Sequence, residues 1–559
     1  MSRTSPFLLK CSPLVLATLL VSAAFASGPY QLGSANTVTA DPNIMRPTTT
    51  PCVVQLFSNA QFQDFNPYAF NFTPPVDCPG PWAKVVFESD ISVTAGIQYD
   101  RTANFWLGPT NIYFGTTAEP SPSLGPSWRV ESDLTDYSSI FATAQAGAAD
   151  IGNTLCCGLS GIIYASADIE FYPLAPGQTA PVTANVVLPL SAGSSGGTVT
   201  LNTSTDMLAG TFTMPTNIQN AYLDVYAQSQ SGDEFWYTCV PTDVATELFS
   251  CGNTGFRETE VTIDGQPAGV APIYPWVFTG GIDPYLWFPL PGVQTLNFIP
   301  YRVDLTPFAG VLSDSQPHTV ALSVYNANGY FSATASLLLY EDSGSTQTSG
   351  KVTQNTLTAP APVVSENLTN TMQGVVGTVG VTSNRSYLIQ GYVNTSHGQV
   401  NTQVAQSVKF SNTQHFVVNT SSFVQNIGVS STIATSTRTF VKGSPLMVKN
   451  QIMTFPLVMD ISQKTQSNGD IFQTTTANQF YTVNDLMLAG GQKISHSLLT
   501  NAGQHIDTLE FDSSFNFLGN TGQSSAQEYN YSDSTGATYS CSLAAANNVL
   551  TAFSPGCPQ

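Results

Sequence analysis

The chain has 559 residues, and its 16 Lys and Arg against 36 Asp and Glu give a net charge of −20 at pH 7. This acidic balance repels phosphate backbones, which excludes nucleic-acid binding through a basic face. The 42% hydrophobic and 11% aromatic residues exclude a wholly disordered chain. Few Lys and Glu residues, together with much Thr, Val, Tyr and Phe, favour β-structure over helical bundles.

The first 26 residues have the pattern of a secretory signal peptide. Arg3 and Lys10 form a positive start, residues 14–24 an apolar core, and residues 24–26 a small-x-small cleavage site. The alternative is a membrane anchor, but the apolar run is shorter than the roughly 20 residues that a bilayer requires. We therefore expect a protein that is secreted, to the extracellular space or the periplasm, and not held in a membrane.

The pattern of the remaining chain predicts an all-β fold with two jelly-roll or β-sandwich domains and a further β-rich C-terminal region. A polar lead segment occupies residues 27–50. Short alternating runs between turn residues predict a first jelly-roll domain over 51–175 and a second over 176–345. An uncharged stretch at 171–205, rich in Pro, Gly, Ser and Thr, indicates the boundary between them. Alternating strands with very few charges predict a β-rich C-terminal domain over 346–559.

Eight cysteines follow the predicted signal peptide, and an even number in an exported chain indicates disulfides. Spacing alone does not determine which cysteines pair. Nearest-neighbour pairing would give Cys52–Cys78, Cys239–Cys251 and Cys541–Cys557, and would leave Cys156 and Cys157 as a candidate vicinal bridge.

The sequence indicates no cofactor. It has no Cys-x-x-Cys pair, and its five histidines are scattered, so we expect no metal site. Phosphate-binding glycine loops are absent, which makes a nucleotide cofactor unexpected. The Gly-x-Ser-x-Gly elbow of serine hydrolases is also absent.

Three clusters bring acidic and aromatic residues together in a chain that is poor in charge. They contain Asp100, Arg101, Trp106 and Glu119; Glu234 and Trp236; and Arg257, Glu258, Trp276 and Trp287. Sugar rings stack on aromatic side chains and hydrogen-bond to carboxylates, and paired carboxylates can divide acid and base roles. The clusters therefore indicate a carbohydrate-active protein, either an enzyme or a lectin. The plain alternatives are an ion pair between Asp100 and Arg101, and solvated strand ends for Glu234 and Glu258.

Ordered strings around these clusters match a known family. The strings cover residues 51–52, 72–79, 99–101, 105–108, 115–120, 233–237, 255–258, 264–265, 278–284 and 286–287, with weaker echoes at 391–393 and 396–398. Together they resemble the peptide:N-glycanase A family, acid-active amidases of plants, fungi and some bacteria. The short lead and the acidic balance are more similar to the acid-active bacterial members.

The string from Asp100 to Asn104 is also similar to the catalytic aspartate string of the flavobacterial peptide:N-glycanases, which consist of two jelly rolls. The resemblance implies that Asp100 is the catalytic carboxylate. It also implies a second carboxylate shortly before Phe256-Arg257, where this chain has no glutamate, so we expect Glu234 or Glu258 to take that role. The residues expected to bind substrate are Arg101, Trp106, Glu119, Trp236, Arg257, Trp276 and Trp287.

The resemblance implies hydrolysis of the amide that joins asparagine to the first N-acetylglucosamine of an N-glycan. The substrates would be N-glycosylated peptides and proteins, and the products a glycosylamine and an aspartate. The family works without metal at acidic pH and accepts glycans with core α1,3-fucose. Two alternatives remain open: a non-catalytic glycan-binding β-protein, and a glycoside hydrolase that uses a carboxylate pair.

Overall fold

The computed structural model describes residues 30–441 and 443–558, so the predicted signal peptide lies outside the described residues. The predicted all-β fold class is confirmed, because the described residues form 29 strands and a single four-residue α-helix, α1 (Ala309–Leu312). Short 3-10 helices cover Thr135–Ala142, Ser231–Asp233, Trp236–Thr238, Pro284–Trp287 and Thr306–Phe308. Within the described part of the chain, no helix has the length and apolar character needed to cross a bilayer.

The first sandwich consists of two four-stranded antiparallel sheets, with the strand orders β1-β8-β3-β6 and β2-β7-β4-β5. Their bounds are β1 (Cys52–Phe62), β2 (Tyr68–Phe72), β3 (Trp82–Val93), β4 (Thr102–Leu107), β5 (Thr110–Thr116), β6 (Ser127–Asp133), β7 (Gln145–Ile151) and β8 (Ile163–Pro173). Alternate residues of β8 are buried, as expected for a strand with one face in a core. The inner faces meet in a core that includes Phe87, Phe105 and Phe171.

The second sandwich pairs a five-stranded sheet, β10-β17-β12-β15 with β9 beside β17, with a four-stranded sheet, β11-β16-β13-β14. Its strands are β9 (Val186–Leu190), β10 (Val199–Leu201), β11 (Leu208–Thr213), β12 (Ile218–Gln230), β13 (Glu258–Ile263), β14 (Gln266–Pro272), β15 (Tyr301–Asp304), β16 (Pro317–Tyr325) and β17 (Tyr330–Glu341). Long loops between β12 and β13 and between β14 and β15 carry the strings at 233–237, 278–284 and 286–287 and most of the string at 255–258.

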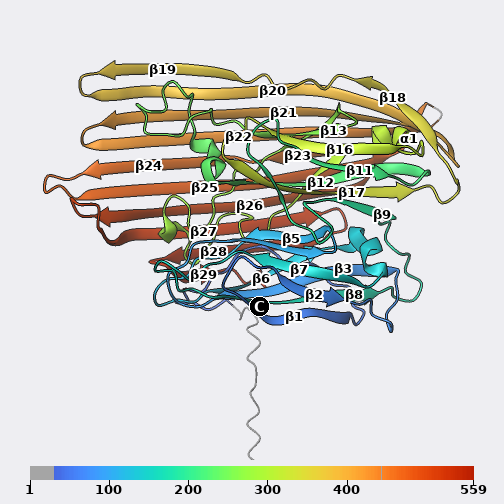
Figure 1. The fold of residues 1–559 in the computed structure, drawn as a ribbon, viewed down its shortest axis with the longest axis horizontal. Coiled ribbons are helices and arrows are strands. Elements are labelled where there is room, and N and C mark those ends of the chain that lie inside the picture. The colour runs from blue at the N-terminus through green and yellow to red at the C-terminus, as the bar shows by residue number, and fades with distance from the viewer. Residues whose placement is uncertain (1–29, 442, 559) are drawn as a thin grey trace, which may run out of the picture.

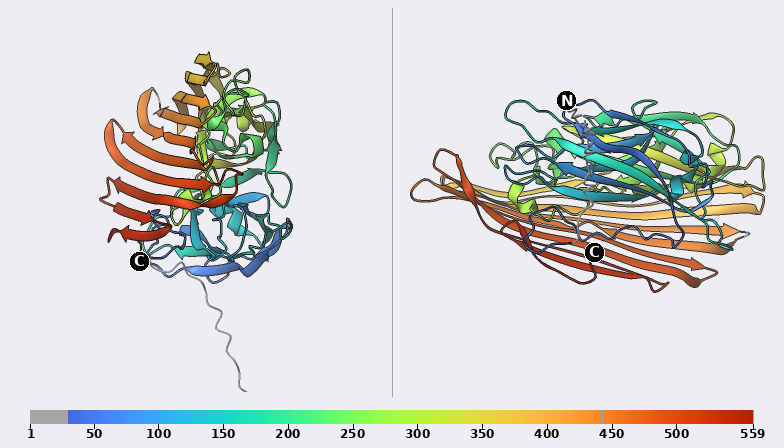
Figure 2. Two further views of the ribbon diagram at one scale, coloured as in Figure 1. Left: turned by 90° about the vertical axis from the view of Figure 1, so that its left-hand side faces the viewer. Right: turned by 90° about the horizontal axis from the view of Figure 1, so that it is seen from below.

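The C-terminal region forms one antiparallel sheet of 12 strands, some of them 22 residues long. Its strands are β18 (Ser349–Asn355), β19 (Val363–Thr371), β20 (Gly374–Thr395), β21 (Gly398–Asn419), β22 (Ser422–Val441), β23 (Ser444–Thr454), β24 (Leu457–Thr465), β25 (Ile471–Ala489), β26 (Gln492–Phe511), β27 (Phe517–Asp533), β28 (Thr538–Ala546) and β29 (Val549–Phe553). The sheet lies along one side of both sandwiches (Figures 1 and 2).

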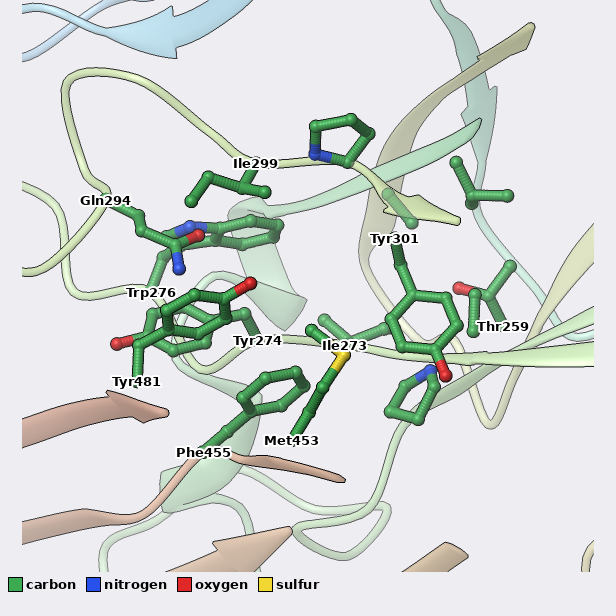
Figure 3. Close-up of a pocket in the computed structure, with 15 residues that line it drawn as sticks. Thr259, Ile273, Tyr274, Trp276, Gln294, Ile299, Tyr301, Met453, Phe455 and Tyr481 are labelled. Atoms are coloured by element: carbon green, nitrogen blue, oxygen red, sulfur yellow. The ribbon is translucent and has the colours of Figure 1, made fainter. Parts of the chain in front are cut away.

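The inner face of this sheet shares a hydrophobic core with the second sandwich. Figure 3 shows the contact, in which Met453, Phe455 and Tyr481 of the sheet face Tyr274 and Trp276 of the sandwich. Phe455 and Tyr481 stack with ring centroids 5.6 Å apart. The cavity left between these side chains has a volume of only about 30 Å³, so the two parts pack closely.

Residues 30–50 form a strap that links the first sandwich to the C-terminal sheet. The amide of Asn501 in β26 donates to Asp41 at 2.7 Å. The guanidinium of Arg46 forms ion pairs with three glutamates on β3, β6 and β8, with distances of 3.1 Å to Glu88 and 3.0 Å to Glu170. The strap therefore fixes the first sandwich relative to the sheet.

The three nearest-neighbour disulfides are present: Cys52–Cys78, Cys239–Cys251 and Cys541–Cys557. The candidate vicinal bridge is wrong, because Cys156 and Cys157 are free and exposed. Adjacent Cα atoms across a trans peptide are about 3.8 Å apart, less than the roughly 4.4–6.8 Å that a disulfide usually spans.

Candidate active site

A cleft of about 900 Å³ lies between the two sandwiches. The first sandwich contributes Tyr99, Asp100, Arg101 and Glu119, and the second contributes Glu234 and Gly280 among others. The structure thus brings together four of the charged residues that the sequence singled out. The three carboxyl groups and one guanidinium come from three separate sequence strings, so only the tertiary fold unites them.

Backbone pairing next to β4 and β5 places Asp100 beside Glu119. The N–H of Arg101 donates to the hydroxyl of Thr117 at 2.8 Å, and the N–H of Thr117 donates to the carbonyl of Arg101 at 2.9 Å. This pairing continues the β4–β5 ladder beyond its strand ends. The N–H of Asp100 then donates to Oε1 of Glu119 at 3.0 Å. Glu119, which is buried, therefore holds the backbone that carries Asp100.

Glu234 reaches the cleft from a tight turn after β12. Its N–H donates to the carbonyl of Ser231 at 3.1 Å. Its neighbour Asp233 is fully buried and accepts from Nε of Arg257 at 2.9 Å and from the N–H groups of Asn328 and Gly329 at 2.7 Å. A buried charge needs such partners. Arg257, predicted to bind substrate, instead lies buried outside the cleft lining and fixes this turn.

Burial raises the pKa values of the three carboxyl groups described above, and also that of Asp150, a fourth carboxyl group that lines the cleft. Desolvation raises the pKa of Asp100 to about 6, while a hydrogen bond from the N–H of Gly280 and the charge of Arg101 oppose the rise. Desolvation followed by the charge of Asp100 raises the pKa of Glu234 to about 7 and that of Glu119 to about 8. Asp100 is thus the first of the three to ionise as the pH rises, and the others stay protonated longer.

Arg101 supplies the positive charge of the cleft. One Nη2 hydrogen bond, 2.6 Å to Oε1 of Gln98, orients the guanidinium. Its centre also lies 5.8 Å from the ring centroid of Tyr99, within cation–π range. Among the described residues its buried Nε has no acceptor. Because Arg101 lines the cleft, its guanidinium can donate to a carbonyl or hydroxyl oxygen of a bound substrate.

Gly280 brings the backbone of the second sandwich against the carboxyl groups of the first. A Cβ atom at this position would lie 2.7 Å from Oδ1 of Asp100 and closer still to Oε1 of Glu119. Glycine leaves room for both carboxyl groups without displacing either of them.

Glu258, predicted as a candidate catalytic residue, does not line this cleft. It begins β13, is 1% exposed, and forms an ion pair with Arg385 of β20. Arg385 also contacts Glu260 at 2.7 Å. This network joins the second sandwich to the C-terminal sheet. Because Glu258 is buried in this contact, a substrate in the cleft cannot reach its side chain.

The four tryptophans predicted to bind substrate are buried core residues and do not line the cleft. Their exposed fractions are 1% for Trp106 and Trp236, 2% for Trp287 and 4% for Trp276. Trp276 packs on Phe298 at 4.5 Å between centroids, and Trp236 on Phe410 of the C-terminal sheet at 6.0 Å.

Two exposed aromatic rings line the cleft instead, Tyr99 at 60% and Phe65 at 69% exposure. Neither residue is among those predicted from the sequence to bind substrate. Tyr99 stands directly before Asp100 and could have been noticed there, whereas Phe65 lies in a turn after β1 and carries no comparable signal.

Comparisons with known proteins agree with the sequence strings. Residues 42–358 match the family described as peptide N-acetyl-beta-D-glucosaminyl asparaginase amidase A. Peptide-N4-(N-acetyl-beta-glucosaminyl)asparagine amidase A of Prunus dulcis is 31% identical over 388 residues, which is 66% of this chain and 67% of that protein.

Two solved structures also align with part of this chain. Recombinant peptide:N-glycanase F aligns with 52% of this chain and 96% of its own, at 14% identity and a TM-score of 0.36. The structure of PNGF-II aligns with 52% of this chain and 66% of its own, at 13% identity and a TM-score of 0.36. The family match covers more than half of the chain, so this protein belongs to the peptide N-acetyl-beta-D-glucosaminyl asparaginase amidase A family.

Proposed function

We propose that this protein is a secreted amidase of N-glycosylated peptides and proteins. It hydrolyses the β-aspartylglucosaminyl amide bond, releases the glycan as a glycosylamine and converts asparagine to aspartate. Membership of the family and the identity to the Prunus dulcis amidase support this proposal. The observation that carries it is the meeting of Asp100, Arg101, Glu119 and Glu234 in one cleft between two sandwiches.

The raised and separated pKa values give the carboxyl groups different roles in amide hydrolysis. Asp100 ionises first and takes a proton from the attacking water as the new C–O bond forms. A neutral carboxyl group then gives a proton to the departing nitrogen as the C–N bond breaks, which yields aspartate and a glycosylamine. Arg101 donates to the carbonyl oxygen, where negative charge develops. Each acid or base step contributes on the order of 10²–10⁴ in rate.

Glu234 is a better proton donor than Glu119. Its side chain is half-buried and faces the cleft, so it can reach a substrate. Glu119 is more deeply buried, and its Oε1 already accepts from the N–H of Asp100. We therefore assign proton donation to Glu234 and the positioning of Asp100 to Glu119.

We expect kcat/KM to have a maximum on the acidic side of neutrality. It should rise with pH as Asp100 ionises, around its pKa of about 6, and fall as Glu234 loses its proton, around its pKa of about 7. Initial rates with a glycopeptide from about pH 3 to about pH 9 measure the profile. Glu234→Gln should lower the maximum and remove the alkaline limb that Glu234 sets. Activity that keeps rising above pH 8 in the wild type would contradict these roles.

We expect Tyr99→Ala to raise KM roughly three- to tenfold with little change in kcat, because a stacked ring contributes modestly to binding and does not touch the reacting bond. The exposed face of Tyr99 at the cleft is the basis for this expectation. Tyr99→Phe, which keeps the ring, serves as the matched control. Steady-state kinetics with a chitobiose-bearing glycopeptide measure both constants, and an unchanged KM in the alanine variant would exclude Tyr99 as a platform.

One assay separates this function from the alternatives. A denatured N-glycoprotein is incubated with the protein at acidic pH, and the peptides are then analysed by mass. Glycan release with an asparagine-to-aspartate change supports the amidase. Release that leaves one N-acetylglucosamine on asparagine indicates a glycoside hydrolase, and binding without release indicates a lectin.

The family resemblance also leads us to propose tolerance of core α1,3-fucose and export from the cell. Parallel assays with fucosylated and plain glycopeptides test the first. The three disulfides support the second, because such bonds persist in oxidising compartments. Amino-terminal sequencing of protein recovered outside the cytoplasm would show whether cleavage occurs near Ser27.

A further inference from the structure

A pair of buried aspartates joins the second sandwich to the C-terminal sheet behind the cleft. Asp283 lies in the loop between β14 and β15, and Asp507 lies on β26. Both residues are 0% exposed. The 3-10 helix that follows Asp283 packs against β26, which carries Asp507. A side-chain hydrogen bond between the two aspartates affects the pKa of each. Two carboxyl groups can form such a bond only if one of them carries a proton, so the pair shares a proton.

The other contacts of the two aspartates bring no positive charge, so the shared proton alone reduces the negative charge of the pair. Oδ1 of Asp283 accepts from the N–H of Tyr285 at 3.0 Å, and Oδ1 of Asp507 accepts from the amide of Asn520 at 3.0 Å. The Oδ2 atoms of both aspartates receive no donor from any other described residue. Among the described residues, no lysine or arginine forms an ion pair with either carboxyl group.

The loop held by this pair carries Gly280, whose backbone lies so close to Asp100 that a Cβ atom there would be 2.7 Å from Oδ1 of Asp100. The loop is compact: the N–H of Gly281 donates to the carbonyl of Phe278 at 2.9 Å, and the N–H of Asp283 donates to the carbonyl of Gly281 at 2.7 Å. The indole N–H of Trp287 donates to the same carbonyl of Gly281 at 3.0 Å. A shift of Asp283 would therefore move Gly280.

Neighbouring strands of the sheet hold the same loop. Tyr285 stacks on Phe517 of β27 at 5.4 Å between centroids, and Nδ1 of His505 on β26 lies 3.2 Å from the carbonyl of Leu286. The titratable groups that face the pair are thus Tyr285 from its own loop and His505 from the sheet. His505 is fully buried, and burial lowers its pKa to about 4, so it stays neutral and supplies no counter-charge above that pH.

We propose that Asp507 is a positioning residue of the active site: through a proton shared with Asp283, it holds the Gly280 loop against the C-terminal sheet and keeps Asp100 in place. This inference rests on the proposed function for its kinetic part. It gives the C-terminal sheet a role in catalysis although no strand of that sheet lines the cleft.

The bond should fail as the pH rises. Desolvation and the charge of Asp507 raise the pKa of Asp283 to about 7, and desolvation raises the pKa of Asp507. A carboxyl group whose pKa is higher in the folded than in the unfolded state stabilises the fold most below its unfolded pKa, and this stability is lost as the pH rises through the folded pKa. Loss of the shared proton leaves two buried negative charges that repel each other and push the loop away from the sheet.

Two substitutions at Asp507 test the proposal. Asp507→Asn keeps the shape of the side chain, and its amide can donate to Asp283 at any pH. The variant should therefore have the kcat of the wild type at pH 5. At pH 8 it should retain a larger fraction of its pH 5 kcat than the wild type retains. Asp507→Ala removes the bond and should lower kcat roughly 10- to 100-fold. The change in KM should be smaller, because the substitution displaces Asp100 but leaves the residues that bind the sugar in place. Asp485→Asn, on β25 of the same sheet and hydrogen-bonded to Gln451, is the matched control.

Thermal unfolding supplies a readout that needs no activity. From pH 5 to pH 8 the wild-type Tm should fall by roughly 2–4 °C more than the Tm of Asp507→Asn, because only the wild type loses the shared proton. Parallel Tm profiles and a ratio of activities independent of pH would overturn the proposal. If the wild type releases no glycan, the proposed function fails, and the Tm comparison still decides whether the pair shares a proton.

Discussion

Asp100→Asn should lower glycan release by at least 10²–10⁴-fold at every pH, because an amide side chain cannot take a proton from water. The substitution keeps the shape of the side chain and leaves the bond between the Asp100 N–H and Glu119 available, so the fold should remain intact. Single-turnover release of glycan from a glycopeptide, measured by mass, gives the rate. Circular dichroism and Tm report the fold.

The matched control for this variant is Asp77→Asn on the same sandwich. Asp77 is exposed and outside the cleft, so its replacement should leave the rate unchanged. A folded Asp100→Asn variant with a rate near that of the wild type would move the catalytic base elsewhere and would remove the observation on which the proposed mechanism depends.

Gly280→Ala should reduce kcat about 100-fold while the protein stays folded. The new methyl group would lie 2.7 Å from Oδ1 of Asp100 and would also overlap Oε1 of Glu119. Both atoms are ends of side chains, so they can move away at small cost to stability. A displacement of about 1 Å in a catalytic group is nevertheless enough for a loss of about 10² in rate. Steady-state kinetics and Tm, measured on the same preparation, separate the two effects.

Gly193→Ala is the control for this substitution, because a Cβ there meets no atom within 4 Å. It should match the wild type in both kcat and Tm. If Gly280→Ala retained full kcat, the close approach of the loop to Asp100 would be irrelevant to the reaction. The proposed role of Asp507 would then fail with it, since that role acts through the same loop.

Asp100, Gly280 and Asp507 differ in whether the sequence alone marks them as important. Asp100 stands in a string that resembles a catalytic one, and Gly280 stands in another matching string, so both were visible in the sequence. Asp507 stands in an ordinary strand of the C-terminal sheet, where no motif marks it. Its significance depends on contact with Asp283, which lies far away in the chain.

The sequence by itself determined the fold class and much of the chemistry. Alternation of apolar and polar residues has the period of a strand, so β-structure was predictable from local pattern. The three disulfides join neighbours in sequence, and short separations made nearest-neighbour pairing effective. Sparse charge drew attention to Asp100, Arg101 and Glu234, which the fold brings to one cleft.

Only the tertiary structure decided which side chains face substrate and which face another layer. Tryptophan and glutamate are residue types common in sugar-binding sites, but the C-terminal sheet covers both Trp236 and Glu258. Phe410 packs on Trp236, and Arg385 forms an ion pair with Glu258. The single 12-stranded sheet likewise depends on pairings across the whole last third. Alternation shows that a strand has two faces, whereas long-range packing determines what lies against each face, and local pattern contains no information about it.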